Sequence, residues 1–503
     1  MIGKKKVLNR RKFLKNAGIA AAGLAAAGCD HSFFTSEARS QRPNILWLIA
    51  EDICPDLGCY GNRGVRTPNL DKLAAQGALY TGAFTSSPVC SPSRSAFMTG
   101  MYQTAIRAHQ HRTKNKKPLP SPVKVITEYF RDAGYFTCSC KGVQWQESGK
   151  EDFNFVIENA FDGTDWRQRS GGQPFFAQVH FSETHRVFVR DPQNPIDPAK
   201  VSVPPYYPDH PLTRRDWANY LECIQILDKK VGVVLRRLAD DGLADNTIVF
   251  FFGDNGRPHL RDKATLYDGG IHVPLIVRRP GHIEPGTVVE DLVSAIDLAP
   301  TSLRAANIQP PEHMHGRIFL GEGAEKRKFI FAQKDRVDEG SDRVRCVRTK
   351  RFKYIRNFQP DQRLVRGYYK RFFYPVFPLM KVLLKQGKLS AAQAAAILPN
   401  RPSEELYDVK SDPHELHNLV DDDRHQSTLR IMRAELRKWM IRIGDEHSVP
   451  ETGPDSPAEV AKRRREKYDR MWQKRGLPRA MKPEDYVRYW EAQLLDPAKS
   501  DVK

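Results

Sequence analysis

Two pairs of oxygen-bearing side chains, far apart in the sequence, each follow a run of apolar residues. The first pair is Glu51 and Asp52, and the second is Asp254 and Asn255. Carboxylate and amide oxygens without nitrogen or sulfur donors are the ligands that hard divalent cations such as Ca²⁺ and Mg²⁺ prefer. Asp-Asn-Gly by itself also favours a simple turn. Because both pairs stand at equivalent positions after apolar runs, we interpret them together as metal ligands.

Three carboxylates around one divalent ion leave a site negatively charged, so an anionic substrate needs cations nearby. Arg94, Lys141 and Lys263 are the candidates. Arg94 ends the pentapeptide CSPSR, which begins at Cys90. A cysteine beside a turn proline is usually a buried packing residue. A thiolate nucleophile is a second alternative, but no cysteine-protease or redox signature accompanies Cys90.

The elements that must position these residues alternate between strand and helix. Continuous apolar runs indicate strands buried on both faces, and amphipathic stretches indicate helices. We expect strands at residues 44–50, 78–85, 134–140, 174–181 and 247–253, and helices at residues 67–75, 121–133 and 217–238. Alternation of this kind predicts an α/β fold with a mainly parallel sheet.

The reactive residues follow the ends of these predicted strands. In a parallel sheet the carboxyl ends of the strands share one edge, and ligands bind in the crevice there. We therefore expect five strand ends to meet at one site, although their residues are far apart in the sequence. These ends carry Glu51 and Asp52, Cys90, Lys141, His185, and Asp254 and Asn255.

The domain organisation is predicted from changes in pattern along the chain. Residues 43–322 form the α/β domain. Residues 323–450 carry short antiparallel strands at 328–332, 344–349 and 352–357 and a helix at 423–442, which indicates a smaller α+β domain. Residues 451–503 are a charged extension with helical segments on the surface. At 503 residues, two domains is the natural expectation.

The pentapeptide at Cys90 resembles the C-x-P-S-R signature of the formylglycine-dependent sulfatases, complete with Thr99-Gly100 downstream. Similar landmarks occur in the family's order at residues 43–58, 67–71, 253–256, 267–271 and 405–408. The segment 406–419 is similar to the heparan N-sulfatase (sulfamidase) branch. The resemblance implies the alkaline phosphatase-like fold and a sulfuric ester hydrolase that acts on a sulfated carbohydrate.

The resemblance also implies a cofactor and a modification. One Ca²⁺ per chain would be held by Glu51, Asp52, Cys90, Asp254 and Asn255. Cys90 would be converted to formylglycine by a maturation enzyme. The first acidic ligand is commonly Asp in this family, and the longer Glu51 at this position is a departure.

Catalytic roles follow from the same resemblance. The hydrate of formylglycine attacks sulfur and later expels sulfate, so the nucleophile at Cys90 regenerates itself. Arg94 is expected to hold the hydrate, Lys141 and Lys263 to bind sulfate, and His185 to protonate the leaving oxygen.

One family histidine has no counterpart by this alignment. It sits two residues after the lysine equated with Lys141, where this chain has Val143. His109, His111 and His259 are candidate replacements for the base that assists sulfate expulsion. Polar residues in two loops are also expected to line the substrate pocket, with a merely structural loop role as the alternative. These residues are His109, His111, Arg112, Arg257 and His259.

The formal charge of +20 and pI near 9.5 predict attraction to polyanions. No nucleic-acid-binding module accompanies this charge, so we expect a sulfated carbohydrate and no nucleic-acid partner. Two other functions remain open from the sequence. One is a phosphatase or phosphonate hydrolase of the same superfamily, and the other is a non-catalytic, tethered glycan-binding protein with the same fold.

The first 29 residues resemble a twin-arginine export signal. An Arg-Arg pair at residues 10–11 precedes an apolar run at residues 17–28, which is too short to span a membrane. Residues 26–29 resemble a lipoprotein cleavage box, which predicts a lipid tether on Cys29; simple signal-peptidase cleavage is the alternative. We expect an exported, periplasmic or cell-surface protein, joined to its signal by a linker at residues 30–42. The eight cysteines show no disulfide-scaffold spacing.

Overall fold

The computed structural model describes residues 42–445, 451–478 and 481–496. The predicted export signal at residues 1–29, Cys29 and almost all of the predicted linker lie outside the described residues. No helix within the described part of the chain is both long enough and apolar enough to cross a membrane.

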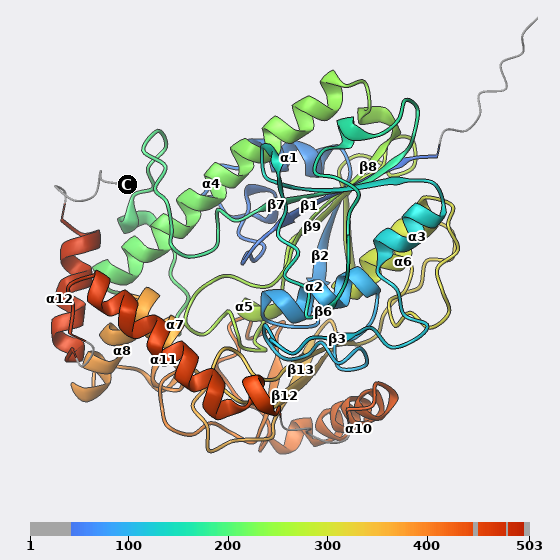
Figure 1. The fold of residues 1–503 in the computed structure, drawn as a ribbon. Helices are drawn as coiled ribbons and strands as arrows, with labels where there is room; N and C mark the ends of the chain where they lie inside the picture. The colour runs from blue at the N-terminus through green and yellow to red at the C-terminus, as the bar shows by residue number, and fades with distance from the viewer. Residues whose placement is uncertain (1–41, 446–450, 479–480, 497–503) are drawn as a thin grey trace, which may run out of the picture. The chain divides into compact units, whose positions relative to one another are not determined.

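An eight-stranded sheet forms the centre of the fold, in the order β10-β2-β9-β8-β1-β7-β4-β5 (Figure 1). Strand β1 pairs in parallel with β7 and β8, β4 pairs in parallel with β7, and β10 with β2. β9 and the edge strand β5 are antiparallel to their neighbours. The predicted mainly parallel sheet is confirmed. The strands are β1 Asn44–Ala50, β2 Ala78–Phe84, β4 Phe136–Lys141, β5 Gln144–Ser148, β7 Phe175–Phe181, β8 Thr247–Gly253, β9 Leu275–Arg278 and β10 Thr287–Ser294.

Helices cover both faces of this sheet, because the strand residues alternate between two apolar clusters. Leu46 and Leu48 of β1 belong to a cluster with Leu227 of α4. Trp47 belongs to another cluster with Phe97 of α2. A strand that is apolar on both sides requires a helix layer on each, as the unbroken apolar run predicts. One layer holds α1 Pro68–Ala75 and α4 Pro211–Asp240; the other holds α2 Cys90–Thr99, α3 Ile126–Asp132 and α6 Leu298–Ala305.

The largest differences between predicted and observed helix starts concern two helices. The helix predicted at residues 121–133 begins only at Ile126, where the Val125 N–H is capped by the Glu128 carboxylate at 3.3 Å. The helix predicted to begin at Trp217 begins at Pro211, since proline suits the first helical position and His210 caps it. Both errors arise from local capping, which the apolar periodicity does not report.

A second, four-stranded antiparallel sheet has the order β11-β12-β13-β14. Its first three strands were predicted with small shifts, and β14 completes it. Helix α10 packs against β12 and β13 through Leu436 and Trp439. The elements of this part are β11 Ile330–Lys334, β12 Val344–Arg348, β13 Phe352–Asn357, β14 Glu404–Asp408 and α10 Gln426–Arg442.

Four further helices lie together at one side of the fold, coloured orange to red in Figure 1. Helix α11 packs on α7, and α12 packs on α8 and α4. Aromatic residues, including Phe372 and Trp472, join α7, α11 and α12, whereas Leu379 of α8 packs with Val487 of α12 in a separate cluster. The helices are α7 Tyr368–Phe373, α8 Val376–Lys385, α11 Pro457–Lys474 and α12 Pro483–Leu494; the short remaining elements are β3 Lys117–Pro118, β6 Phe155–Val156, α5 Asp268–Ile271 and α9 Ala391–Ala394.

Candidate active site

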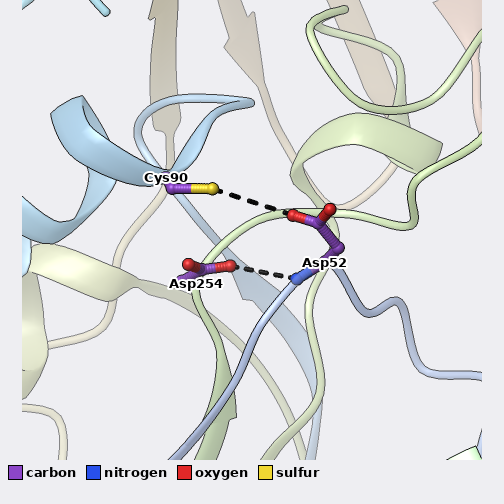
Figure 2. Close-up of side chains that lie close together, drawn as sticks. All are labelled: Asp52, Cys90 and Asp254. Carbon is purple, nitrogen blue, oxygen red and sulfur yellow. Dashed lines mark hydrogen bonds between the residues drawn. The ribbon is translucent and has the colours of Figure 1, made fainter. Parts of the chain in front are cut away.

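Three acidic or sulfur-bearing side chains meet at the carboxyl edge of the central sheet. Asp52 follows β1, Cys90 begins α2, and Asp254 follows β8; their ligand atoms all lie within 4.8 Å of one another (Figure 2). The Asp52 N–H donates to Asp254 Oδ1 at 3.1 Å, and Cys90 Sγ lies 3.8 Å from Asp52 Oδ1. All three side chains are buried. Parallel strands thus bring together residues about 200 positions apart in the chain.

Asn255 and Glu51 flank this cluster in different ways. Asn255 donates to Asp52 Oδ1 at 2.9 Å, while its own Oδ1 is buried with no hydrogen-bond partner among the described residues. A buried amide oxygen without a donor is costly unless a ligand satisfies it. Glu51 instead binds Lys150 Nζ at 2.7 Å and lies 4.0 Å from Arg94 Nη2. The donor set therefore fits a hard divalent cation, with Glu51 at its edge.

Cys90 occupies the first position of α2, where the partial positive charge of a helix N-terminus favours a negatively charged group. Burial raises the pKa of the unmodified Cys90 thiol to about 11, so this thiol is protonated at neutral pH. Lys263 Nζ lies 3.4 Å from Cys90 Sγ and 2.6 Å from both Asp52 oxygens. Burial alone would raise the pKa of Asp52, but Lys263 lowers it to about 2, so the carboxylate is ionised.

Arg94 follows Cys90 by one helical turn and connects Asp254 to β7. Its Nε donates to Asp254 Oδ2 at 2.9 Å, and its Nη1 donates to the Lys150 carbonyl at 2.9 Å. Nη1 also lies 2.8 Å from His180 Nδ1. Burial, together with the charge of Arg94, lowers the pKa of His180 well below its usual value, so the neutral ring accepts this hydrogen bond.

His185 reaches the same site from the loop after β7. Its Nε2 lies 3.9 Å from Asp52 Oδ2, and its Nδ1 donates to the Arg186 carbonyl at 2.7 Å. Burial lowers the pKa of His185. His185, Cys90 and Lys263 line a cavity of about 280 Å³, which extends outward to α7 and α11. A group bound in this cavity against Cys90 is therefore near the Lys263 ammonium and the His185 imidazole.

Comparison with known proteins matches this architecture. The family model described as Sulfatase matches residues 43–166 and 140–308. An ulvan-active sulfatase of Formosa agariphila is 36% identical over 470 residues, covering 82% of this chain and 77% of the relative. The chain belongs to the sulfatase family. Membership makes it a sulfuric ester hydrolase, as the sequence predicts.

Two further comparisons concern the branch of the sulfatase family that this chain resembles. The model for the N-sulphoglucosamine sulphohydrolase C-terminal region matches residues 256–365, so neither family model reaches α11. The human N-sulphoglucosamine sulphohydrolase is 29% identical, covering 81% of this chain and 91% of its own. The predicted resemblance to the sulfamidase branch is consistent with both.

Solved structures confirm the alkaline phosphatase-like fold. One is the structure of another protein in complex with that protein's substrate, D-glucosamine-2-N,6-O-disulfate. It has a TM-score of 0.59 at 15% identity, and the match covers 80% of this chain and 99% of the other. Another is the phosphonate monoester hydrolase of Agrobacterium radiobacter, with a TM-score of 0.58 at 20% identity over 81% of this chain and 96% of the other. At such identities the likeness concerns the fold alone.

The structure does not bring Lys141 into the sulfatase site. Lys141 ends β4, is half-exposed, and pairs with Glu147 at 2.7 Å. The chain then turns into β5, and Gly149 returns to β4, where its N–H donates to the Ser139 carbonyl at 3.1 Å. Lys150 follows and reaches Glu51. The antiparallel hairpin thus carries Lys150, rather than the residue at the end of β4, to the site. β5 has no counterpart among the strands expected from the apolar runs of the sequence.

His180 is the other site residue that sequence reasoning missed. It lies in β7, in a run where every side chain is buried. A histidine in such a strand is unusual, because buried polar side chains need a partner. This was a usable signal, and the partner is Arg94.

The loop residues predicted to line the pocket divide into two groups. His111 and Arg112 line the cavity with Cys90. His111 Nδ1 lies 3.3 Å from Asp338 Oδ1, and Arg112 pairs with Asp152 at 2.9 Å.

The other three do not line this cavity. His259 is enclosed by aromatic rings, with its ring centroid 4.1 Å from that of Trp217. Arg257 pairs with Asp56 at 3.3 Å and is mostly buried. His109 also lies outside the lining residues. Of the three histidines considered as the second base, His111 alone is at the cavity.

Proposed function

We propose that this sulfatase removes sulfate from fragments of a sulfated polysaccharide, with Cys90 converted to formylglycine and one Ca²⁺ bound beside it. The observation that carries the proposal is the buried group of Asp52, Cys90 and Asp254, of which Cys90 lines a basic cavity. The oxygen donors favour Ca²⁺ or Mg²⁺, and the family resemblance favours Ca²⁺.

Asp52, Asp254, Asn255 and the modified Cys90 would hold the ion, with Glu51 completing the acidic side. When bound, the ion polarises a sulfate oxygen and lowers the pKa of the attacking hydroxyl. The hydrated aldehyde at position 90 supplies that hydroxyl, and its second hydroxyl allows sulfate to leave. A maturation enzyme that generates formylglycine is the implied partner.

The chain's own cations compensate the charge of the bound sulfate. Lys263 Nζ lies 3.4 Å from Cys90 Sγ, the charge of Lys150 also acts on the Cys90 position, and Arg94 binds Asp254. Fixed cations of this kind need no reorganisation when charge develops in the transition state. His185 offers Nε2 toward the cavity, because its Nδ1–H is held by the Arg186 carbonyl. The neutral ring carries its proton on Nδ1, so donation from Nε2 requires the doubly protonated ring, whose charge the neighbouring Asp52 carboxylate favours. We propose that this imidazolium gives its Nε2 proton to the leaving oxygen, or to the leaving nitrogen of a sulfamate, as the bond to sulfur breaks, and is left neutral with its proton on Nδ1.

The substrate class is supported by the relatives and by charge. Proteins named as ulvan-active sulfatase and as N-sulphoglucosamine sulphohydrolase are both similar to this chain. The chain carries a formal charge of +20, and most charged residues that line the cavity are basic. An anionic saccharide is attracted by this positive electrostatic potential. We also propose export, from the signal-like residues 1–29, with a lipid tether on Cys29.

Sulfate release from defined sulfated di- and oligosaccharides tests the proposal. The enzyme should be produced with a formylglycine-generating enzyme, and mass spectrometry should find the aldehyde at position 90. The parent is expected to hydrolyse at least one saccharide and an aryl sulfate, whereas Cys90→Ala should be inactive. Equal rates for the two proteins would contradict the proposal. Faster hydrolysis of a matched aryl phosphate or phosphonate would favour the rival activity instead.

A further inference from the structure

Helix α11 forms the outer wall of the cavity that contains Cys90. Arg464, Lys467, Tyr468 and Met471 line it. These positions are spaced by three, one and three residues, so they share one face of the helix. The C-terminal extension therefore presents a definite helical face to the site instead of lying on the surface as a solvated tail.

Packing against α7 fixes the position of this face (Figure 1). The ring centroids of Phe372 and Trp472 are 5.3 Å apart, and those of Tyr368 and Tyr468 are 6.1 Å apart. The Arg475 guanidinium lies 3.6 Å from the Phe372 ring centroid. A helix held by buried aromatic residues places its lining side chains with little freedom.

Most of the cations in the cavity wall are already paired. Six of them each form an ion pair with a carboxylate: Arg112, Arg186, Lys263, Lys334, Arg366 and Arg464. Lys370 is buried and donates to two backbone carbonyls. Lys467 differs from these, because it is exposed and makes no ion pair with any described residue. Its Nζ lies 5.8 Å from the Tyr468 ring centroid.

A second observation points to a polar ligand in the same cavity. The hydroxyls of Tyr369 and Tyr374 are buried, and neither has a hydrogen-bond partner among the described residues. Both tyrosines line the cavity, and Tyr374 is 1% exposed. Buried hydroxyls are rarely left without a partner. They offer donors and acceptors to the hydroxyl groups of a sugar between Cys90 and α11.

We infer that Lys467 binds a second anionic group of the saccharide, a carboxylate or a further sulfate, while the scissile sulfate lies at Cys90. The inference rests on the proposed function and deepens it. It makes Lys467 a specificity-determining residue, because the contact helps only substrates with two anionic groups. Lys467 contributes to binding and has no part in the chemical step, so its effect belongs in KM rather than kcat.

Steady-state kinetics on matched substrates test this inference. The substrates are an aryl sulfate, a monosulfated uronate-containing disaccharide, the same disaccharide with its carboxyl reduced, and the reduced form with a second sulfate. Lys467→Ala is expected to raise KM about fivefold on the substrates with a second anion, the size expected for a partly exposed ion pair. KM on the aryl sulfate and on the reduced monosulfate, and kcat on all of them, should stay within about twofold.

Two further variants serve as controls. Lys467→Arg should restore most of the affinity, since it keeps the charge. Lys462→Ala removes the same charge from an exposed position elsewhere on α11 and should leave KM unchanged. A KM effect confined to the carboxylated disaccharide identifies a carboxylate as the partner, and one confined to the disulfated form identifies sulfate.

The inference is overturned if Lys467→Ala changes KM by less than twofold on every substrate, or equally on the aryl sulfate and the dianionic saccharides. Either result leaves the proposed function intact, provided that the parent hydrolyses the aryl sulfate. A parent that releases sulfate from none of the substrates would overturn the proposed function and this inference with it.

Discussion

Two lysines of the same hairpin have opposite surroundings. Lys141 lies in solvent beside Glu147, while Lys150 is mostly enclosed and binds Glu51 at 2.7 Å. The Lys150 carbonyl also accepts from Arg94. A sulfate bound at Cys90 would be close to the charge of Lys150 and far from that of Lys141. The role that the family resemblance assigns to Lys141 is therefore proposed for Lys150.

Lys150→Ala is expected to lower kcat/KM about a hundredfold, the usual loss when a fixed charge-stabilising donor is removed. Lys141→Ala is the matched control and should stay within about twofold, since exposed ion pairs contribute little. Initial rates on an aryl sulfate measure both. Comparable losses in the two variants would contradict the assignment.

The proposed Ca²⁺ site at Asp52, Cys90 and Asp254 leads to a prediction that does not depend on turnover. Ca²⁺ that binds the folded chain should raise the melting temperature as its concentration increases. Asp254→Ala should abolish this rise, because it removes one of the three clustered ligands. The measurement is a thermal-shift titration of chelator-treated enzyme. Asp245→Ala, at an exposed position, is the control and should respond as the parent does. A parent without any shift would contradict the metal site.

At the scale of elements, the β4–β5 hairpin decides where Lys150 lies. Gly149 sits where a side chain would collide with its neighbours: a Cβ there would be 2.3 Å from His180 Cδ2 and 2.4 Å from Ser139 Oγ. The close approach of the two segments thus requires glycine at this position. His180, which lies against Gly149, also accepts a hydrogen bond from Arg94, so the packing at Gly149 affects the position of Arg94.

Gly149→Ala is expected to destabilise the fold by about 1–3 kcal/mol, the range for overpacking a buried position. Activity should fall as well, because Lys150 and His180 must shift. Urea unfolding and aryl sulfate hydrolysis measure the two effects. Gly171→Ala places its Cβ in open space and should change neither. A stable, fully active Gly149→Ala enzyme would show that the hairpin tolerates the displacement.

A buried carboxylate that does not itself line the cavity joins several elements of the fold. Asp342 pairs with Lys334 of β11 at 2.8 Å, with Arg366 at 3.2 Å, and with Arg401. Burial alone would raise the pKa of Asp342, but these cations lower it far below its usual range. A carboxyl group with a lowered pKa stabilises the fold above its unfolded pKa of about 4, and this contribution is lost as the pH falls below that value.

Asp342→Asn is expected to cost about 3–5 kcal/mol at pH 7, because it leaves buried cations without their counter-charge. The difference from the parent should shrink as the pH falls from about 5 toward 3, where the parent begins to lose the same interaction. Urea unfolding at several pH values measures it. Asp361→Asn, at an exposed position, serves as control. A constant difference across this range would contradict the role of the charge.

At the scale of the whole molecule, the catalytic edge of the first sheet and the C-terminal helices form one cavity. Cys90 stands at its base and Lys467 at its outer wall. The residues that define the reaction come from the sheet edge, whereas the residues inferred to select the substrate come from α7 and α11. Function within one fold can thus vary with the elements that surround a common centre.

The sequence by itself determined the fold class, most strand positions and the family. Apolar runs fix buried strands, and the strand ends of a parallel sheet must share an edge. This physical constraint alone predicts that Asp52, Cys90 and Asp254 meet at one site. The CSPSR motif is local, so it could be recognised without tertiary information.

Only the tertiary structure decided which other side chains join that edge. Lys150 takes part because β5 reverses the chain, and His259 does not because aromatic rings enclose it. Lys467 reaches the cavity because α11 packs on α7. Contacts between segments that are distant in the sequence depend on how whole elements pack, and no local pattern in the sequence reports that.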